Sequence, residues 1–171
     1  MQLVLYICNQ LQFETGTNVI ETILTIRNMN HESKIKKLRI FLRVYGVLTL
    51  LIFSVISVAF IFQLQDFNPG GKFNWVIWDD VYGHVGPMLV VIYLVWGVYF
   101  FVAAKDPVKY RTFLDFTMWA NAAHGLLMIP MALVGSMYHS KFLTDIPFIL
   151  ILALGIYLWR PEIKKESPQA R

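Results

Sequence analysis

Four long apolar stretches, each bounded by polar or basic residues, dominate the pattern along the chain. They cover residues 44–64, 85–104, 113–137 and 142–159. A helix of about 20 apolar residues crosses the hydrocarbon core of a bilayer, and the first two stretches contain no charged side chain. The pattern therefore predicts an all-α fold, a four-helix transmembrane bundle.

The segment before the first apolar stretch has a less regular pattern. Apolar positions over residues 19–26 have helical spacing and suit a short surface helix. Met29 opens a polar lead that looks like a natural start, and initiation there would leave residues 1–28 untranslated. The predicted organisation is an N-terminal extension with a basic amphipathic lead over residues 1–38, a four-span membrane domain over 39–161 and a polar cytoplasmic tail over 162–171.

Aromatic residues gather in the first loop, over residues 65–83. Trp75, Trp78 and Tyr82 follow a Pro-Gly-Gly turn there. Since Trp and Tyr concentrate at membrane interfaces, we expect an interfacial aromatic belt. A ligand-binding aromatic lid is the alternative.

The composition agrees with a membrane protein and excludes other classes. Residues of hydrophobic type make up 57% of the chain and charged residues 15%, against about 25% charged in an average soluble domain. So few charges cannot cover a soluble surface, and disorder requires low hydrophobicity. The single cysteine, Cys8, permits no intrachain disulfide and no cysteine metal cluster.

Lysine and arginine are distributed unevenly between the segments that flank the spans. Five lie directly before the first span, within residues 34–43. One, three and one occupy the successive loops, and four lie in the tail. Cytoplasmic segments are the ones enriched in Lys and Arg. The alternation predicts that both termini are cytoplasmic, in the cytoplasmic membrane of a bacterium. The net charge of +4 is thus assigned to membrane orientation, and no nucleic-acid partner is expected.

The third span carries a polar stripe. Its members are spaced at i, i+4, i+7 and i+11 and so share one helix face: Thr117, Asn121, His124 and Met128. Small residues beside them, Gly125 among them, allow close approach of a neighbouring helix. This face is therefore predicted to lie inside the bundle.

His124 lies near the middle of its span, where an ionisable group is by default a functional hypothesis. Desolvation favours the neutral imidazole near pH 7, which could relay a proton, ligate a metal, or donate a hydrogen bond to a quinone or pigment carbonyl. The alternative is a structural histidine that bonds to another helix through Asn121. No second midspan histidine exists, because His84 and His139 fall near the outer face, so no metal or other cofactor is expected.

Charged residues near the span ends have structural interpretations. Arg111 and Asp115 are spaced as an i, i+4 ion pair at the cytoplasmic boundary, with proton exchange at Asp115 as the alternative. Asp145 is predicted to cap the N-terminus of the fourth helix. A weaker alternative groups it with His84 and His139 as a cation site.

The stretch over residues 102–161 resembles a known family. The family is a domain of unknown function found in small bacterial four-helix membrane proteins, with an A-A-x-[DN]-P turn, an F-T-x-W helix start and a mid-helix His. Three segments of this chain are similar to these motifs in that order: Val102-Ala103-Ala104-Lys105-Asp106-Pro107, Phe113-Leu114-Asp115-Phe116-Thr117-x-Trp119 and Ala123-His124-Gly125-x-x-Met128. Tyr110 stands where that family often has a histidine. The resemblance implies fold and membrane location and no activity. DoxX-like four-helix proteins are similar in shape, but their motifs find no residue-by-residue match.

These features predict a small accessory or interaction protein of the membrane, without independent catalysis. Its expected partners are the lipid bilayer and other membrane proteins or further copies of the chain. One alternative is a redox- or proton-handling protein that uses His124, with Asn121 orienting the ring and Asp115 exchanging protons. Another is a small transporter that acts as an oligomer.

Overall fold

The computed structural model describes residues 2–78, 82–134 and 136–161, with side chains from residue 29 onward over most of these ranges. The predicted tail over residues 162–171 lies outside the described residues. Four helices make up the fold: α1 (Gln2–Ile61), α2 (Val85–Lys105), α3 (Arg111–Val134) and α4 (Asp145–Trp159). Short 3-10 turns lie between them: η1 (Gln65–Phe67), η2 (Asn74–Val76) and η3 (Ser136–Phe142).

Four segments are long and apolar enough to cross a membrane, and the described residues contain no strand. The segments are Met29–Ile61, Val85–Lys105, Arg111–Val134 and Tyr138–Trp159. The all-α architecture with four candidate spans, predicted from the hydropathy pattern, is thereby confirmed.

The first helix is much longer than the apolar stretch that predicted it. α1 runs without interruption through the extension, the basic lead and the first span, so the short surface helix expected over residues 19–26 is part of it. Its 60 residues correspond to about 90 Å at 1.5 Å per residue. The physical reason is the absence of a helix breaker: the first proline of the chain is Pro69. The helix ends where Gln63 adopts a positive φ of 50°, the left-handed conformation common after helix C-termini.

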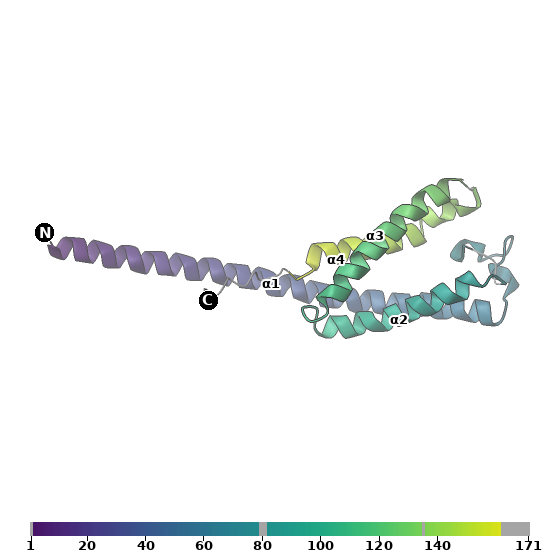
Figure 1. Ribbon diagram of the computed structural model, residues 1–171, viewed down its shortest axis with the longest axis horizontal. Helices are drawn as coiled ribbons and strands as arrows, with labels where there is room; N and C mark the ends of the chain where they lie inside the picture. The colour runs from purple at the N-terminus through teal and green to yellow at the C-terminus, as the bar shows by residue number, and fades with distance from the viewer. Residues whose placement is uncertain (1, 79–81, 135, 162–171) are drawn as a thin grey trace, which may run out of the picture.

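The helices form two hairpins that converge at one end and diverge at the other (Figure 1). α1 packs along α2, and α3 packs along α4. At the converging end, beside the turn over residues 106–110, all four helices share one hydrophobic core. Its buried members are Leu38, Leu42, Tyr45, Phe100, Ala103, Ala104, Leu114, Met118, Leu152 and Ile156.

Close approach between helices depends on glycine at two positions. A Cβ at Gly155 of α4 would overlap the ring of Phe41 on α1. A Cβ at Gly125 of α3 would lie 2.6 Å from the Leu150 side chain of α4, a distance too short for two carbon atoms. The predicted close approach at Gly125 is therefore confirmed, with α4 as the neighbour.

Toward the other end the shared core divides into two clusters, one in each hairpin. Ile56 and Ala59 of α1 pack with Val90 of α2, whereas Met128 of α3 packs with Ile149 of α4.

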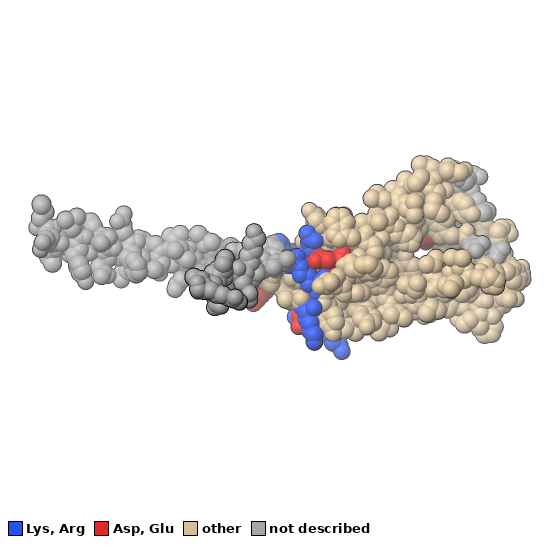
Figure 2. All heavy atoms as spheres, in the orientation of Figure 1, with Lys and Arg blue, Asp and Glu red and all other residues tan. Residues whose placement is uncertain are grey.

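We call the resulting space between α2 and α3 the wedge. Tyr93 of α2 and His124 of α3 meet at its narrow end. Leu89 lies four residues from Tyr93 and Met131 seven residues from His124, so helical spacing places them on the same two faces. Leu89 and Met131, at the mouth, are 45% and 50% exposed. Figure 2 shows the molecular surface hollowed between the two hairpins at this end.

Basic side chains gather at the converging end, where α1 leaves the bundle (Figure 2). This basic belt combines the lead on α1 with residues at the ends of the other three helices. Its members are Lys34, Lys36, Lys37, Arg39, Arg43, Lys105, Lys109, Arg111 and Arg160. The end of the bundle that carries the mouth of the wedge has only Lys72 and Lys141 among the described residues.

Candidate functional site

The polar stripe of α3 lies on the face predicted for it. Thr117, Asn121 and Met128 are buried between helices, and His124 is half-buried. The stripe begins in the shared core and reaches the wedge at His124. Its inward placement follows from helical periodicity, because the four positions fall within about one third of the helix circumference.

Thr117 accepts a hydrogen bond from α2. The indole Nε1–H of Trp96 donates to the Thr117 hydroxyl at 2.9 Å. The Asn121 amide donates to the Thr117 backbone carbonyl at 2.8 Å, within its own helix. Asn121 therefore does not orient His124, and the expectation that the two side chains bond is wrong: at i, i+4 the carbonyl of Thr117 is the nearer acceptor.

His124 instead bonds to Tyr93 of α2. The Tyr93 hydroxyl lies 3.0 Å from His124 Nδ1. The Tyr93 ring is held by stacking on Phe53 of α1, with ring centroids 4.4 Å apart and planes 8° from parallel. Tyr93 and Trp96 are three residues apart and share a helix face, so they place two hydrogen-bonding groups toward α3.

These two side-chain bonds link the hairpins. Close backbone approach between α2 and α3 is scarce, because the helices diverge, and the long side chains of Tyr93 and Trp96 reach across to α3. The sequence analysis missed both residues. Their signal was a Tyr and a Trp at i, i+3 in a stretch, residues 85–104, where Tyr99 is the one other side chain that can donate a hydrogen bond.

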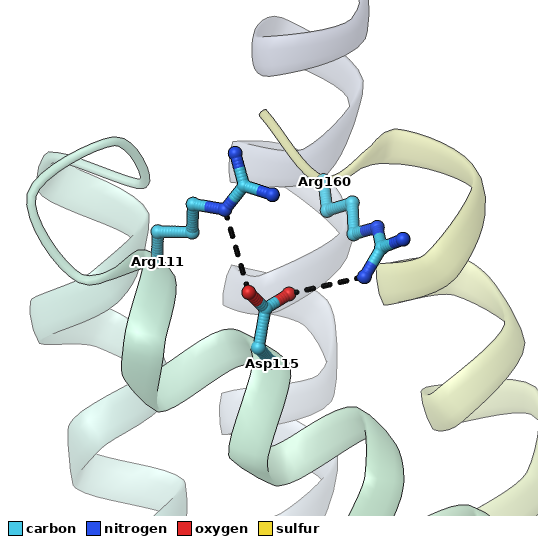
Figure 3. A network of polar contacts seen from close by, with 3 residues as sticks. All are labelled: Arg111, Asp115 and Arg160. Atoms are coloured by element: carbon cyan, nitrogen blue, oxygen red, sulfur yellow. Dashed lines mark hydrogen bonds and ion pairs between the residues drawn. The ribbon is translucent and has the colours of Figure 1, made fainter. Parts of the chain in front are cut away.

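A charged cluster joins α3 to α4 at the basic end (Figure 3). One oxygen of Asp115 pairs with Arg111 Nε at 3.4 Å, and the other with Arg160 Nη1 at 3.3 Å. The predicted Arg111–Asp115 pair is confirmed, and Arg160 is an additional partner from the end of α4. The Asp115 carboxylate, paired with two guanidinium groups, links the start of α3 to the end of α4.

A second charged cluster lies at the open end. Lys141 is 1% exposed, and its ammonium donates to the Trp75 carbonyl at 2.7 Å and pairs with Asp145 at 3.2 Å. Trp78 Nε1 donates to the same carboxylate at 2.6 Å, and the Trp78 ring stacks on Tyr138. The aromatic loop therefore contacts the hairpin of α3 and α4, and these contacts connect the two hairpins at their open end.

The expectation for Asp145 is corrected by this cluster. The N-cap position of α4 belongs to Thr144, which makes no capping bond through its side chain, and Asp145 is the first helical residue. Its carboxylate turns to Lys141 and Trp78, which both contact Oδ2. The ammonium of Lys141 neutralises the carboxylate, and the Trp78 indole donates a second hydrogen bond to the charged group. In the described part of the chain no three His, Cys, Asp or Glu side chains are grouped to hold a metal ion, so the alternative of a cation site with His84 and His139 does not form there.

Comparison with models of known protein families, with curated proteins and with solved structures gives no match. The resemblance noted in the sequence therefore stays a prediction.

Proposed function

We propose that this chain is a multi-pass protein of the bacterial cytoplasmic membrane with both chain ends on the cytoplasmic side. The basic belt supports this orientation. Nine Lys and Arg residues surround one end of the helices, against two at the other among the described residues. Basic residues flanking spans are retained on the cytoplasmic side.

Single-cysteine labelling tests the orientation. In a Cys8→Ser background, Lys72→Cys places a thiol in the first loop and Val108→Cys places one in the exposed turn between α2 and α3. A membrane-impermeant maleimide should label the first variant in intact cells and the second only after permeabilisation. The reverse pattern, or labelling of both in intact cells, would contradict the topology.

The protein's role in this membrane is proposed to be that of an accessory or interaction protein without catalysis of its own. The observation that carries this proposal is the outer face of α3, formed by Phe116, Trp119, Ala123 and Leu126. Trp119 is 68% exposed and lies eight residues inside Arg111, about 12 Å along the helix. Tryptophan favours the interface over the hydrocarbon core, so an outward indole at this depth is better accommodated against protein.

The outer face of α3 fits a transmembrane helix. Ala123 is exposed between larger apolar side chains, and association of helices in lipid depends on van der Waals packing at small residues. The partner is a helix of another membrane protein or of a second copy of this chain. The alternative of an oligomeric transporter has less support, because Thr117 and Asn121 are buried and bonded within one chain.

Site-specific photo-crosslinking in native membranes tests the interaction role. A benzophenone amino acid is placed at Trp119 and, as a matched control, at Val91, which is exposed on α2. We expect a discrete protein adduct from position 119 that is absent from position 91. Adducts with lipid alone at both positions would contradict a protein partner at this face, and a tagged second copy distinguishes self-association from another protein.

A further inference from the structure

The wedge has mainly apolar sides, the Asp145 carboxylate lies near Tyr93 and His124, and the His124 ring presents an unused hydrogen-bonding atom at the narrow end. Among the described residues, the Tyr93 hydroxyl is the one hydrogen-bond partner of the His124 ring, and it contacts Nδ1. Nε2 has no partner in that part of the chain, yet it is not among the buried polar atoms without a partner. Nε2 is therefore accessible from outside the protein.

The bond to Tyr93 determines which nitrogen carries the proton. No other acceptor for the Tyr93 hydroxyl exists among the described residues. A largely buried hydroxyl donates its proton where it can, because leaving it unbonded costs free energy. Tyr93 then donates to Nδ1, and the neutral imidazole carries its own proton on Nε2. His124 thus presents an N–H donor to the wedge.

The depth of this donor restricts what can accept its bond. His124 lies 13 residues from Arg111, about 20 Å along α3, near the middle of the span. Water and lipid headgroups do not reach this depth at low cost. The acceptor has to arrive on a molecule that is itself soluble in the hydrocarbon.

The neighbouring rings favour a planar molecule. Tyr93 stacks on Phe53 and on Trp96, with a centroid distance of 5.8 Å for the second pair. Aromatic rings interact well with a further flat ring in offset or edge-on geometry. Beyond the pair of Tyr93 and His124, the widening wedge offers Leu89 and Met131 to an aliphatic chain.

We propose that the wedge is a binding site for a lipid-soluble quinone, with one quinone carbonyl accepting a hydrogen bond from His124 Nε2–H and the aliphatic tail leaving past Leu89 and Met131. A quinone unites a hydrocarbon-soluble planar ring with a carbonyl acceptor. A phospholipid that entered the wedge would place its acyl tail, which has no acceptor, beside His124. The proposal concerns binding, and it depends on the membrane placement of the helices but not on the outer face of α3.

Binding is tested on the full chain in lipid nanodiscs with a decyl-substituted 1,4-benzoquinone. Quinones quench tryptophan fluorescence, and Trp96 lies beside the site. We expect saturable quenching above the linear background from partition into lipid. His124→Phe removes the donor and should weaken apparent affinity about tenfold, the equivalent of one lost hydrogen bond. His139→Phe, an exposed histidine outside the wedge, is the matched control and should bind as the parent does.

A second pair of variants keeps the test independent of His124. Met131→Trp fills the mouth of the wedge and should abolish saturable quenching, whereas Leu133→Trp adds the same bulk to an exposed position two residues away and should not. Decylbenzene, which lacks the carbonyls, should compete at least tenfold more weakly than the quinone. Equal competition by decylbenzene, unchanged affinity in His124→Phe, or purely linear quenching of the parent would overturn the proposal. Since the photo-crosslinking result does not affect these outcomes, failure of either proposal can be told from failure of the other.

Discussion

Two buried threonines have opposite hydrogen-bonding environments, and replacing each with valine should change stability in opposite directions. Thr117 is fully buried and accepts the Trp96 indole N–H at 2.9 Å. Thr49 is 2% exposed, and its hydroxyl has no partner among the described residues. Valine has nearly the same shape as threonine, so each substitution changes hydrogen bonding with little change in packing.

The expected magnitudes follow from these environments. Thr117→Val leaves the Trp96 N–H without an acceptor between α2 and α3 and should lower the free energy of unfolding by about 1–2 kcal/mol. Interhelical hydrogen bonds in membranes contribute up to about 1.7 kcal/mol, and a buried donor without a partner costs about 1–3 kcal/mol. Thr49→Val removes a buried hydroxyl without a partner, which should raise the free energy of unfolding by about 1 kcal/mol. The two variants should therefore differ by about 2–3 kcal/mol.

Titration with sodium dodecyl sulfate in mixed micelles, followed by far-ultraviolet circular dichroism, measures both variants. A double-mutant cycle with Trp96→Phe isolates the bond: once the indole is absent, Thr117→Val should cost little. Equal shifts for Thr117→Val and Thr49→Val would refute the reasoning. A cost for Thr117→Val that persists undiminished in the Trp96→Phe background would show that packing, and not the hydrogen bond, joins the hairpins at this point.

Three further substitutions test other parts of the structure. Asp115→Asn should lower the free energy of unfolding by about 1 kcal/mol, because its ion pairs are partly exposed and screened, and the loss should shrink as salt is added to the same titration. Gly155→Leu should destabilise the chain by more than about 1 kcal/mol through overlap with Phe41; an unchanged unfolding midpoint would contradict the close approach of α1 and α4. Lys141→Met removes the cation that bonds the first loop and Asp145, so amide hydrogen exchange over residues 62–78 should accelerate, whereas exchange in the shared core should not.

The sequence predicted the features that depend on composition along one helix. Span number follows from stretches of about 20 apolar residues, the inward face of Thr117 and Asn121 follows from helical spacing, and Arg111 with Asp115 is a local i, i+4 pair. The Lys141–Asp145 pair has the same spacing and could have been predicted by the same argument.

Contacts between helices could not be predicted in the same way. Which α2 side chains meet His124 and Thr117 depends on the crossing and register of α2 and α3, and an apolar span gives little indication of either. Arg160 reaches Asp115 only because α4 returns to the start of α3. The continuity of α1 was also missed, because the change from polar lead to apolar span suggested a boundary where the backbone has no reason to break.

The distance across the wedge tests most directly the central claim that two hairpins diverge from a shared core. In a Cys8→Ser background, spin labels at Val85 and Val134, both exposed at the open end, report the separation of α2 from α3. Labels at Ile61 and Val85 report the separation of α1 from α2 within one hairpin. Double electron–electron resonance in nanodiscs should give a clearly longer mean distance for the first pair, since packed neighbours lie about 8–10 Å apart between axes. Equal distances for the two pairs would mean a closed four-helix bundle and would contradict the account.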